Sequence, residues 1–177
     1  MPKPAPQPVP NPRSAAAGEF GLLAEALVAQ WLTQQGAEIL QRRWRCRWGE
    51  LDLIAQLPPT ATAAATLAFV EVKARQNVGW DVGGLLAITP QKQAKLWQAA
   101  ELFLSDYPDL ANENCRFDVA LVWGRSRPIS RLISPTRSTP APHLRIPDSP
   151  IELGQPVAIA HYTLILQHYL PNAFSQC

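Results

Sequence analysis

The 177-residue sequence lacks the features of several large protein classes. Its three cysteines, Cys46, Cys115 and Cys177, are odd in number and widely spaced, so we expect neither a disulfide framework nor a zinc knuckle. No apolar run approaches the roughly 20 residues of a membrane span. Residues 1–12 alternate proline with other residues and do not resemble a secretory signal. We therefore expect a cytoplasmic protein with reduced thiols and no membrane contact.

Common catalytic and cofactor motifs are also missing. The chain has no Gly-rich phosphate loop and no G-x-S-x-G nucleophile elbow. Its three histidines, His143, His161 and His168, are scattered and do not have a metal-ligand spacing. We expect no small-molecule cofactor. Apolar residues make up 47% and charged residues 17%, an ordinary globular balance, and the net charge of +2 does not by itself indicate nucleic acid.

Prolines divide the chain. Six of the 18 lie in residues 1–12, and seven more lie between Pro128 and Pro156. Proline-rich segments without periodic apolar residues are typical of extended linkers or loops. We predict a flexible tail at residues 1–13 and a single domain at residues 14–177, with an insertion rich in proline and arginine at about residues 125–156.

The rest of the chain has the pattern of an α/β domain. Helices are predicted for residues 14–35, with Gly36 as C-cap, and for about residues 90–106, with Thr89 as N-cap. Strands are predicted for residues 39–44, 50–57, 67–74, 117–123 and 158–166. The strand–helix–strand unit at residues 67–123 should be parallel and right-handed. The first three strands are suited to an antiparallel meander, and the whole predicts a mixed β-sheet of about five strands flanked by helices.

Two predicted strands carry acidic residues. Since side chains alternate along a strand, Leu51 and Leu53 should share one face and Asp52 should lie on the other, beside Glu50. On the next strand Glu71 and Lys73 share a face. Two carboxylates can hold Mg²⁺ or Mn²⁺, and a neighbouring lysine can orient water or stabilise charge on phosphate. The alternative interpretation is the solvated face of two amphipathic strands.

Glu25 strengthens the catalytic interpretation. On a helical projection it lies among apolar residues, including Leu22, Val28 and Leu32. A carboxylate in an apolar stripe is costly unless it is paired or binds a metal. The alternative is that Glu25 lies at the edge of the stripe and pairs with a basic neighbour.

A basic, aromatic run at residues 42–48 is suited to nucleic acid. Its Trp44 and Trp48 are suited either to stacking on bases or to the core, and its arginines either to phosphate or to protecting an edge strand. Between residues 18 and 124, acidic residues outnumber basic ones, so only local clustering favours DNA. Asp118 is expected to pair with Arg116 or another base and is given no catalytic role. The candidate phosphate contacts are Arg43, Arg45, Arg47, Arg75 and Lys92, although Lys92 is equally suited to an ordinary helix surface.

Several short segments together resemble a known family. They are Gly21-x-x-x-Glu25, Arg43-Trp44-Arg45, residues 49–54, residues 69–75, residues 115–119 and the late His168-Tyr169 and Asn172-Ala173-Phe174. In their order along the chain and in their residue identities they resemble the YraN-like family of predicted endonucleases. That family is similar to archaeal Holliday-junction resolvases and shares a restriction-endonuclease-like PD-(D/E)xK core.

The resemblance implies roles for four residues. Glu25 resembles the helical acid of that site, Asp52 the acid of the second strand, and Glu71 and Lys73 the E-x-K pair. All four positions are intact, whereas the insertion and the proline-rich tail depart from the usual compact pattern.

The leading hypothesis is a Mg²⁺- or Mn²⁺-dependent DNA endonuclease, selective for branched or junction DNA, with Asp52, Glu71 and Glu25 as metal ligands and Lys73 acting on water or phosphate. A homodimer is one option that the sequence leaves open. The second hypothesis is a non-catalytic nucleic-acid-binding module with the same fold. The third is an interaction protein whose arginine-rich insertion docks an acidic partner.

Overall fold

The computed structural model describes residues 12–61, 64–76, 88–127 and 146–174. These residues form a six-stranded sheet with the strand order β1-β2-β3-β4-β6-β5. All neighbouring strands are antiparallel except β3 and β4, which are parallel. The predicted mixed α/β architecture, with its antiparallel meander and parallel strand–helix–strand unit, is confirmed. The strands are β1 (Glu38–Cys46), β2 (Gly49–Leu57), β3 (Thr66–Arg75), β4 (Asn114–Ser126), β5 (Pro156–Ile159) and β6 (Tyr162–Phe174).

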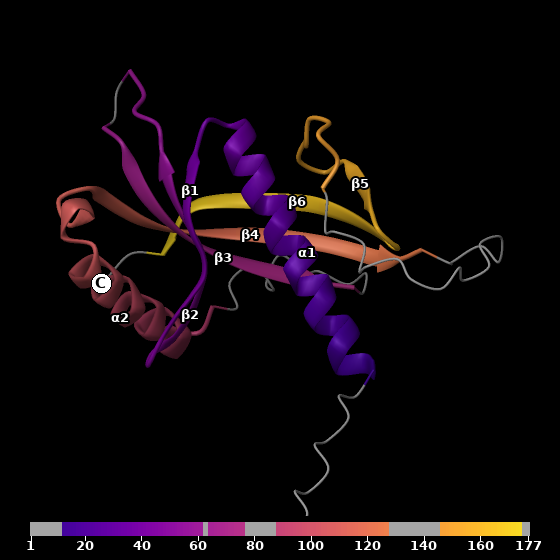
Figure 1. Ribbon diagram of the computed structural model, residues 1–177, viewed down its shortest axis with the longest axis horizontal. Coiled ribbons are helices and arrows are strands. Elements are labelled where there is room, and N and C mark those ends of the chain that lie inside the picture. The colour runs from indigo at the N-terminus through magenta and orange to yellow at the C-terminus, as the bar shows by residue number, and fades with distance from the viewer. Residues whose placement is uncertain (1–11, 62–63, 77–87, 128–145, 175–177) are drawn as a thin grey trace, which may run out of the picture.

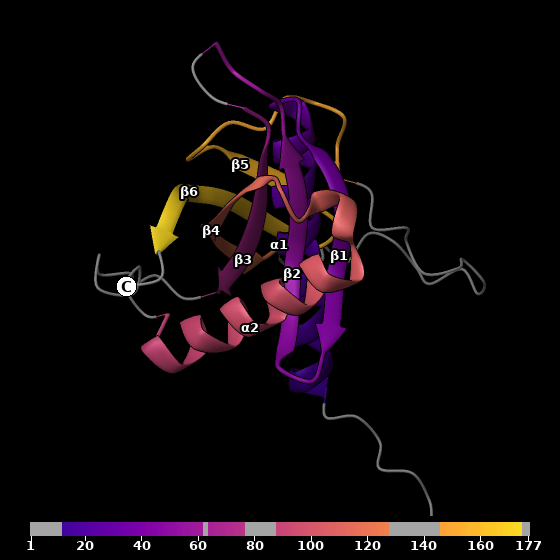
Figure 2. The same cartoon turned by 90° about the vertical axis from the view of Figure 1, so that its left-hand side faces the viewer.

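Two helices cover opposite faces of the sheet, α1 (Pro12–Gln34) and α2 (Pro90–Asp106). Figure 1 shows α1 crossing one face, and Figure 2 shows α2 across the other face, in front of β2 and β3. Each helix closes its own buried cluster of apolar side chains. The α1-side core includes Leu27, Leu53 and Val70, and the α2-side core includes Phe69 and Phe103.

The helix ends follow the predicted capping chemistry. Gly36 has a φ of 86°, a left-handed conformation that ends α1 and is readily accessible to glycine. The Thr89 hydroxyl accepts a hydrogen bond from the Lys92 N–H at 3.3 Å, and Pro90 occupies the first turn of α2. The short 3-10 helix η2 (Pro108–Leu110) then leads to β4.

The last predicted strand is wrong in its extent. Residues 158–166 form two antiparallel strands, β5 and β6, that turn between Ile159 and Tyr162, and β6 continues to Phe174. Ala160 takes a φ of 49° in this turn. Because apolar residues continue on both sides of the turn, the pattern alone shows no break. This hairpin accounts for six strands where about five were predicted.

A buried polar cluster lies near the start of β4. Asp118 is fully buried and accepts hydrogen bonds from Arg116 Nε, from the Tyr169 hydroxyl and from the Asn172 N–H. The predicted pairing with Arg116 is therefore confirmed, and the cluster connects β4 to β6. Burial, followed by the charge of Asp118 and the hydrogen bond to it, raises the pKa of Tyr169.

Some predictions concern residues outside the described ranges: the proline-rich tail up to residue 11, most of the insertion at residues 128–145, and also His143 and Cys177. Cys46 and Cys115 are free thiols, as predicted. Among the helices that the structure describes, none has the length and apolar character needed to cross a membrane.

Candidate active site

The candidate site forms where β2 and β3 cease to pair. Their register runs from Leu57–Thr66 to Leu53–Val70 and ends there. Beyond this point the Asp52 carboxylate accepts a hydrogen bond from the Val72 N–H at 2.7 Å. The Asp52 side chain thus acts as the acceptor for the Val72 N–H, which faces β2 where the two strands no longer pair. This hydrogen bond fixes the position of the carboxylate.

The predicted alternation along β2 is wrong at this place. Leu51 packs in the α2-side core and Leu53 in the α1-side core, so the two do not share a face. The β1–β2 register contains the pairs Arg42–Leu53 and Trp44–Leu51, and between them lie Arg43 and Asp52. Arg43 has a φ of 53°, a left-handed conformation that is uncommon for a residue other than glycine. At this irregularity the strict alternation of side chains along β2 does not hold.

Three carboxylates meet on the α1 side of this irregularity. Glu25 from α1 and Glu50 and Asp52 from β2 place one oxygen each within 4.8 Å of one another. Only 16% of the Glu25 side chain is exposed, as its place in the apolar stripe predicts. Arg43 Nε lies 3.8 Å from Glu25 Oε2, so Glu25 also has the basic neighbour of the alternative interpretation.

Glu50 is a site residue to which the sequence analysis gave no role. Arg43 Nε donates to its Oε1 at 2.6 Å, and Arg45 Nε donates to its Oε2 at 2.5 Å. Burial raises the pKa of Glu50, but the hydrogen bonds from Arg43 and Arg45 outweigh burial, and the net pKa is lowered. The sequence does carry a signal for this role. Glu50 lies two residues before Asp52, and the two arginines lie on the facing strand of the same hairpin.

Glu71 and Lys73 form the other half of the site, on the side of α2. Lys73 Nζ donates to Glu71 Oε1 at 2.7 Å, and Lys92 Nζ from α2 lies 3.3 Å from Glu71 Oε2. Glu71 is only 7% exposed, which contradicts the solvated-face interpretation for this residue. Its Oε2 is buried and has no hydrogen-bond partner, since Lys92 is close but lacks hydrogen-bonding geometry. Such a buried carboxylate oxygen has a lone pair free for a cation.

Asp52 interacts electrostatically with acids of both halves of the site, Glu71 and Glu25. Burial, followed by the charges of Glu71 and Glu25, raises its pKa to about 7, although the Val72 hydrogen bond and Lys92 act in the opposite direction. Burial also raises the pKa of Glu25, against the effect of Arg43. The protein by itself therefore leaves a negative charge on Asp52 poorly compensated, as expected where a cation normally supplies the compensation.

The residues present fit a hard divalent cation. Carboxylate oxygens are the ligands that Mg²⁺ and Mn²⁺ prefer. The group of acids whose oxygens lie within 4.8 Å of one another consists of Glu25, Glu50 and Asp52, and it does not include Glu71. Glu50 is already held by two arginines, whereas Glu71 has a buried oxygen to offer.

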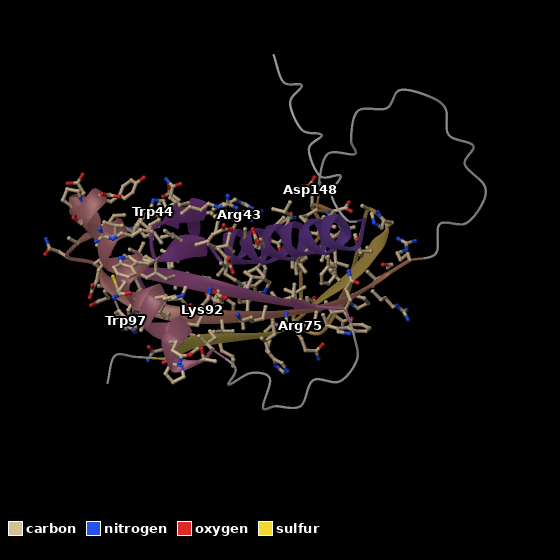
Figure 3. All side chains as sticks on the ribbon, turned by 90° about the horizontal axis from the view of Figure 1, so that it is seen from below. Arg43, Trp44, Arg75, Lys92, Trp97 and Asp148 are labelled. Carbon is tan, nitrogen blue, oxygen red and sulfur yellow. The ribbon has the colours of Figure 1, made fainter. Side chains whose placement is uncertain are left out.

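Three of the predicted phosphate-binding residues lie at the acids of the site. Arg43, Arg45 and Lys92 contact the acids of the site, and Figure 3 shows Arg43 beside α1 and Lys92 on α2. Arg47 lies over the ring of exposed Trp48, 5.2 Å from its centroid. Arg75 is exposed at the end of β3, where its Nη1 donates to the Ala74 carbonyl.

The two tryptophans of the basic run have different environments. Trp44 packs against the α2-side core, edge-on to Phe103 with the ring centroids 5.4 Å apart. Trp48 is 36% exposed at the tip of the β1–β2 hairpin. Of the two, Trp48 is available for stacking on a ligand.

The fold and the site define a mixed α/β protein with an acidic, lysine-flanked candidate metal centre. The chain belongs to the uncharacterised protein family UPF0102, whose family model matches residues 24–122, the range that holds every candidate site residue. UPF0102 proteins of Acaryochloris marina and Trichodesmium erythraeum are similar to it. The first is 43% identical over 99% of both chains, and the second is 45% identical over 88% of both. A UPF0102 protein of Synechocystis is 41% identical over 88% of this chain and 97% of its own length.

Proposed function

We propose that this protein is a metal-dependent endonuclease that hydrolyses phosphodiester bonds of DNA. The observation that carries the proposal is Asp52, fixed by the Val72 N–H between the Glu25–Glu50 pair and the Glu71–Lys73 pair. Asp52 and Glu71 would hold Mg²⁺ or Mn²⁺, and Glu25 would complete the shell directly or through water. The bound ion would polarise the phosphoryl group and lower the pKa of a bound water.

The protein's own cations would have separate tasks. Lys73 Nζ, 2.7 Å from Glu71, orients that carboxylate and can donate to the attacking water or to a phosphate oxygen. Lys92, 39% exposed beside Glu71, can contact the neighbouring phosphate. Arg43, Arg45, Arg47 and Arg75 are proposed contacts to the DNA backbone, because guanidinium groups bind phosphate in bidentate geometry.

We further propose that the site is of the PD-(D/E)xK type and that branched or junction DNA is a preferred substrate. This finer statement rests on the resemblance of Glu25, Asp52, Glu71 and Lys73 to the site of the YraN-like proteins and on their similarity to Holliday-junction resolvases. A homodimer would place two such sites on the two strands of a junction.

A non-catalytic nucleic-acid-binding module is the second candidate. It is favoured by the charge balance of the site, where Arg43, Arg45, Lys73 and Lys92 lie within ion-pair distance of the acids. A module of this kind would bind nucleic acid in a salt-sensitive manner and would not cleave it with any metal.

Cleavage of labelled DNA distinguishes the two candidates. The panel consists of single-stranded, duplex, nicked, flap and four-way-junction DNA, each with Mg²⁺, with Mn²⁺ and with a chelator. Cleavage that needs the metal and is lost in Glu71→Ala supports the endonuclease. Metal-independent cleavage, or equal cleavage by Glu71→Ala, contradicts it, and binding without any cleavage favours the module.

A further inference from the structure

A small pocket lies beside the acidic site, between the tip of the β1–β2 hairpin and α2. Its volume is about 220 Å³, and Trp48, Gly49 and Glu50 line it on the hairpin side. Lys92, Lys95 and Leu96 line it on the helix side. Figure 2 shows the hairpin tip next to α2. Since Glu50 and Lys92 belong also to the acidic site, a ligand in this hairpin–helix pocket would be directly adjacent to that site.

The lining combines an aromatic ring with positive charge. Trp48 is 36% exposed and carries Arg47 over its ring. Lys92 and Lys95 are three residues apart on α2 and therefore neighbours on the helix surface. The negative charge of Glu50 is held by Arg43 and Arg45, which reduces its repulsion of an anionic ligand. An exposed indole next to lysines is the combination with which proteins bind single strands, by base stacking and phosphate contacts.

The size of the pocket limits its occupant. Sites that enclose a whole small ligand measure roughly 300–1,000 Å³, so a pocket of about 220 Å³ is suited to one ring system. A base within a duplex must first be flipped out, at a cost in free energy, to enter such a pocket, whereas an unpaired base enters without this cost.

We propose that the hairpin–helix pocket binds one unpaired nucleobase of a DNA strand, stacked on Trp48, with Lys95 on an adjacent phosphate. The inference rests on the proposed function, because it places this base beside the phosphate to be cleaved. It assigns the substrate class as DNA with an unpaired segment, such as a flap or a gap, in preference to continuous duplex.

Fluorescence anisotropy with a labelled single-stranded oligodeoxyadenylate tests the pocket without requiring cleavage. Every protein in this comparison carries Glu71→Gln, which removes hydrolysis under the proposed function. Trp48→Ala should weaken binding roughly tenfold, the effect of about 1.4 kcal/mol of base–aromatic stacking. Trp48→Phe should retain most of the affinity, and Tyr107→Ala, which alters another exposed aromatic residue beyond the opposite end of α2, should not change it.

A strand of the same length with abasic sugars distinguishes base from backbone contacts. Trp48→Ala should leave the affinity for the abasic strand unchanged. Lys95→Gln should weaken both strands alike, and Arg127→Gln, a change of an exposed arginine outside the pocket, should weaken neither. An equal loss of affinity for both strands in Trp48→Ala, or no loss for either, overturns the inference.

The experiments distinguish a wrong pocket inference from a wrong endonuclease proposal. If cleavage depends on Glu71 but adding Trp48→Ala to the Glu71→Gln protein leaves its affinity for oligodeoxyadenylate unchanged, the pocket inference is wrong and the proposed function stands. If no substrate is cleaved but Trp48-dependent binding of the base-bearing strand is observed, the pocket stands and the endonuclease does not. In an active enzyme, Trp48→Ala should slow cleavage of flap DNA several-fold more than cleavage of nicked duplex.

Discussion

The Val72 N–H donates a hydrogen bond to the Asp52 carboxylate at 2.7 Å, where the ladder between β2 and β3 has ended. This contact fixes an acid of β2 against the backbone of β3, one residue from Glu71. The candidate site therefore depends on the divergence of two strands, and its geometry is set by backbone as well as by side chains.

Asp52 should make the stability of the metal-free protein depend on pH. Because its pKa is raised from 3.8 to about 7 in the folded state, the folded state binds the proton more tightly than the unfolded state. The stabilisation is fully present below about pH 4 and is lost as the pH rises to about 7, with a size of a few kcal/mol. Urea unfolding in a chelator at several pH values measures it.

Asp52→Asn is the control for this pH dependence, since its amide oxygen can still accept from Val72. The variant should show a smaller decrease in unfolding free energy between pH 4 and 7 than wild type, since the raised pKa of Glu25 still contributes. Parallel pH profiles for wild type and Asp52→Asn would contradict the assignment.

Divalent metal should stabilise the folded protein. A ligand that binds only the folded state raises the unfolding free energy by about 2.7 kcal/mol at 100 times its Kd. Mg²⁺ or Mn²⁺ should therefore raise the Tm of wild type, and Asp52→Asn and Glu71→Gln should lose most of this increase. Glu101→Gln, a change of an exposed acid of α2, should behave as wild type. Identical metal shifts in all four proteins would place any ion elsewhere.

Lys73→Met should lower the cleavage rate by roughly 10²–10³-fold, the usual loss when a donor to developing charge is removed. Since Lys73 also pairs with Glu71, its removal should not weaken the metal-induced increase in Tm, because one positive charge near the acid has gone. A parallel assay of rate and metal-induced Tm shift separates the two effects. Loss of the metal response in Lys73→Met would assign the lysine a supporting role for the site's structure.

Asp118→Ala should lower the free energy of unfolding and leave the rate of cleavage unchanged. The substitution leaves Arg116 without its buried partner and removes an acceptor of the Tyr169 hydroxyl and the Asn172 N–H, so a loss of about 3–5 kcal/mol is expected. Urea unfolding measures the loss. At a temperature where the variant remains folded, its cleavage rate per folded molecule should equal that of wild type, and a much lower rate would give Asp118 a role in the site.

Local chemistry allowed much of the fold to be predicted. Thr89 and Pro90 mark the start of α2 because capping and proline geometry depend on neighbouring residues alone. The place of Glu25 in an apolar stripe follows in the same way from helical periodicity. The turn at Ala160 escaped prediction because the apolar pattern continues through it.

The candidate site was harder to derive, since it depends on a departure from regular strand geometry. Leu51 and Leu53 pack in opposite cores beside the left-handed Arg43, and a strict two-residue period does not predict this arrangement. The role of Glu50 depends on Arg43 and Arg45 of the facing strand, a pairing that only the hairpin register brings about.

The most direct test of the central claim is the rate of metal-dependent cleavage of the preferred DNA substrate by wild type, Glu71→Gln and Glu101→Gln. Glu71→Gln keeps the shape of the side chain and removes the charge that would hold the ion, so its rate should fall at least 100-fold while its fold, followed by circular dichroism, is retained. Glu101→Gln should cleave at the wild-type rate. Cleavage by folded Glu71→Gln at the wild-type rate would contradict the proposed active site.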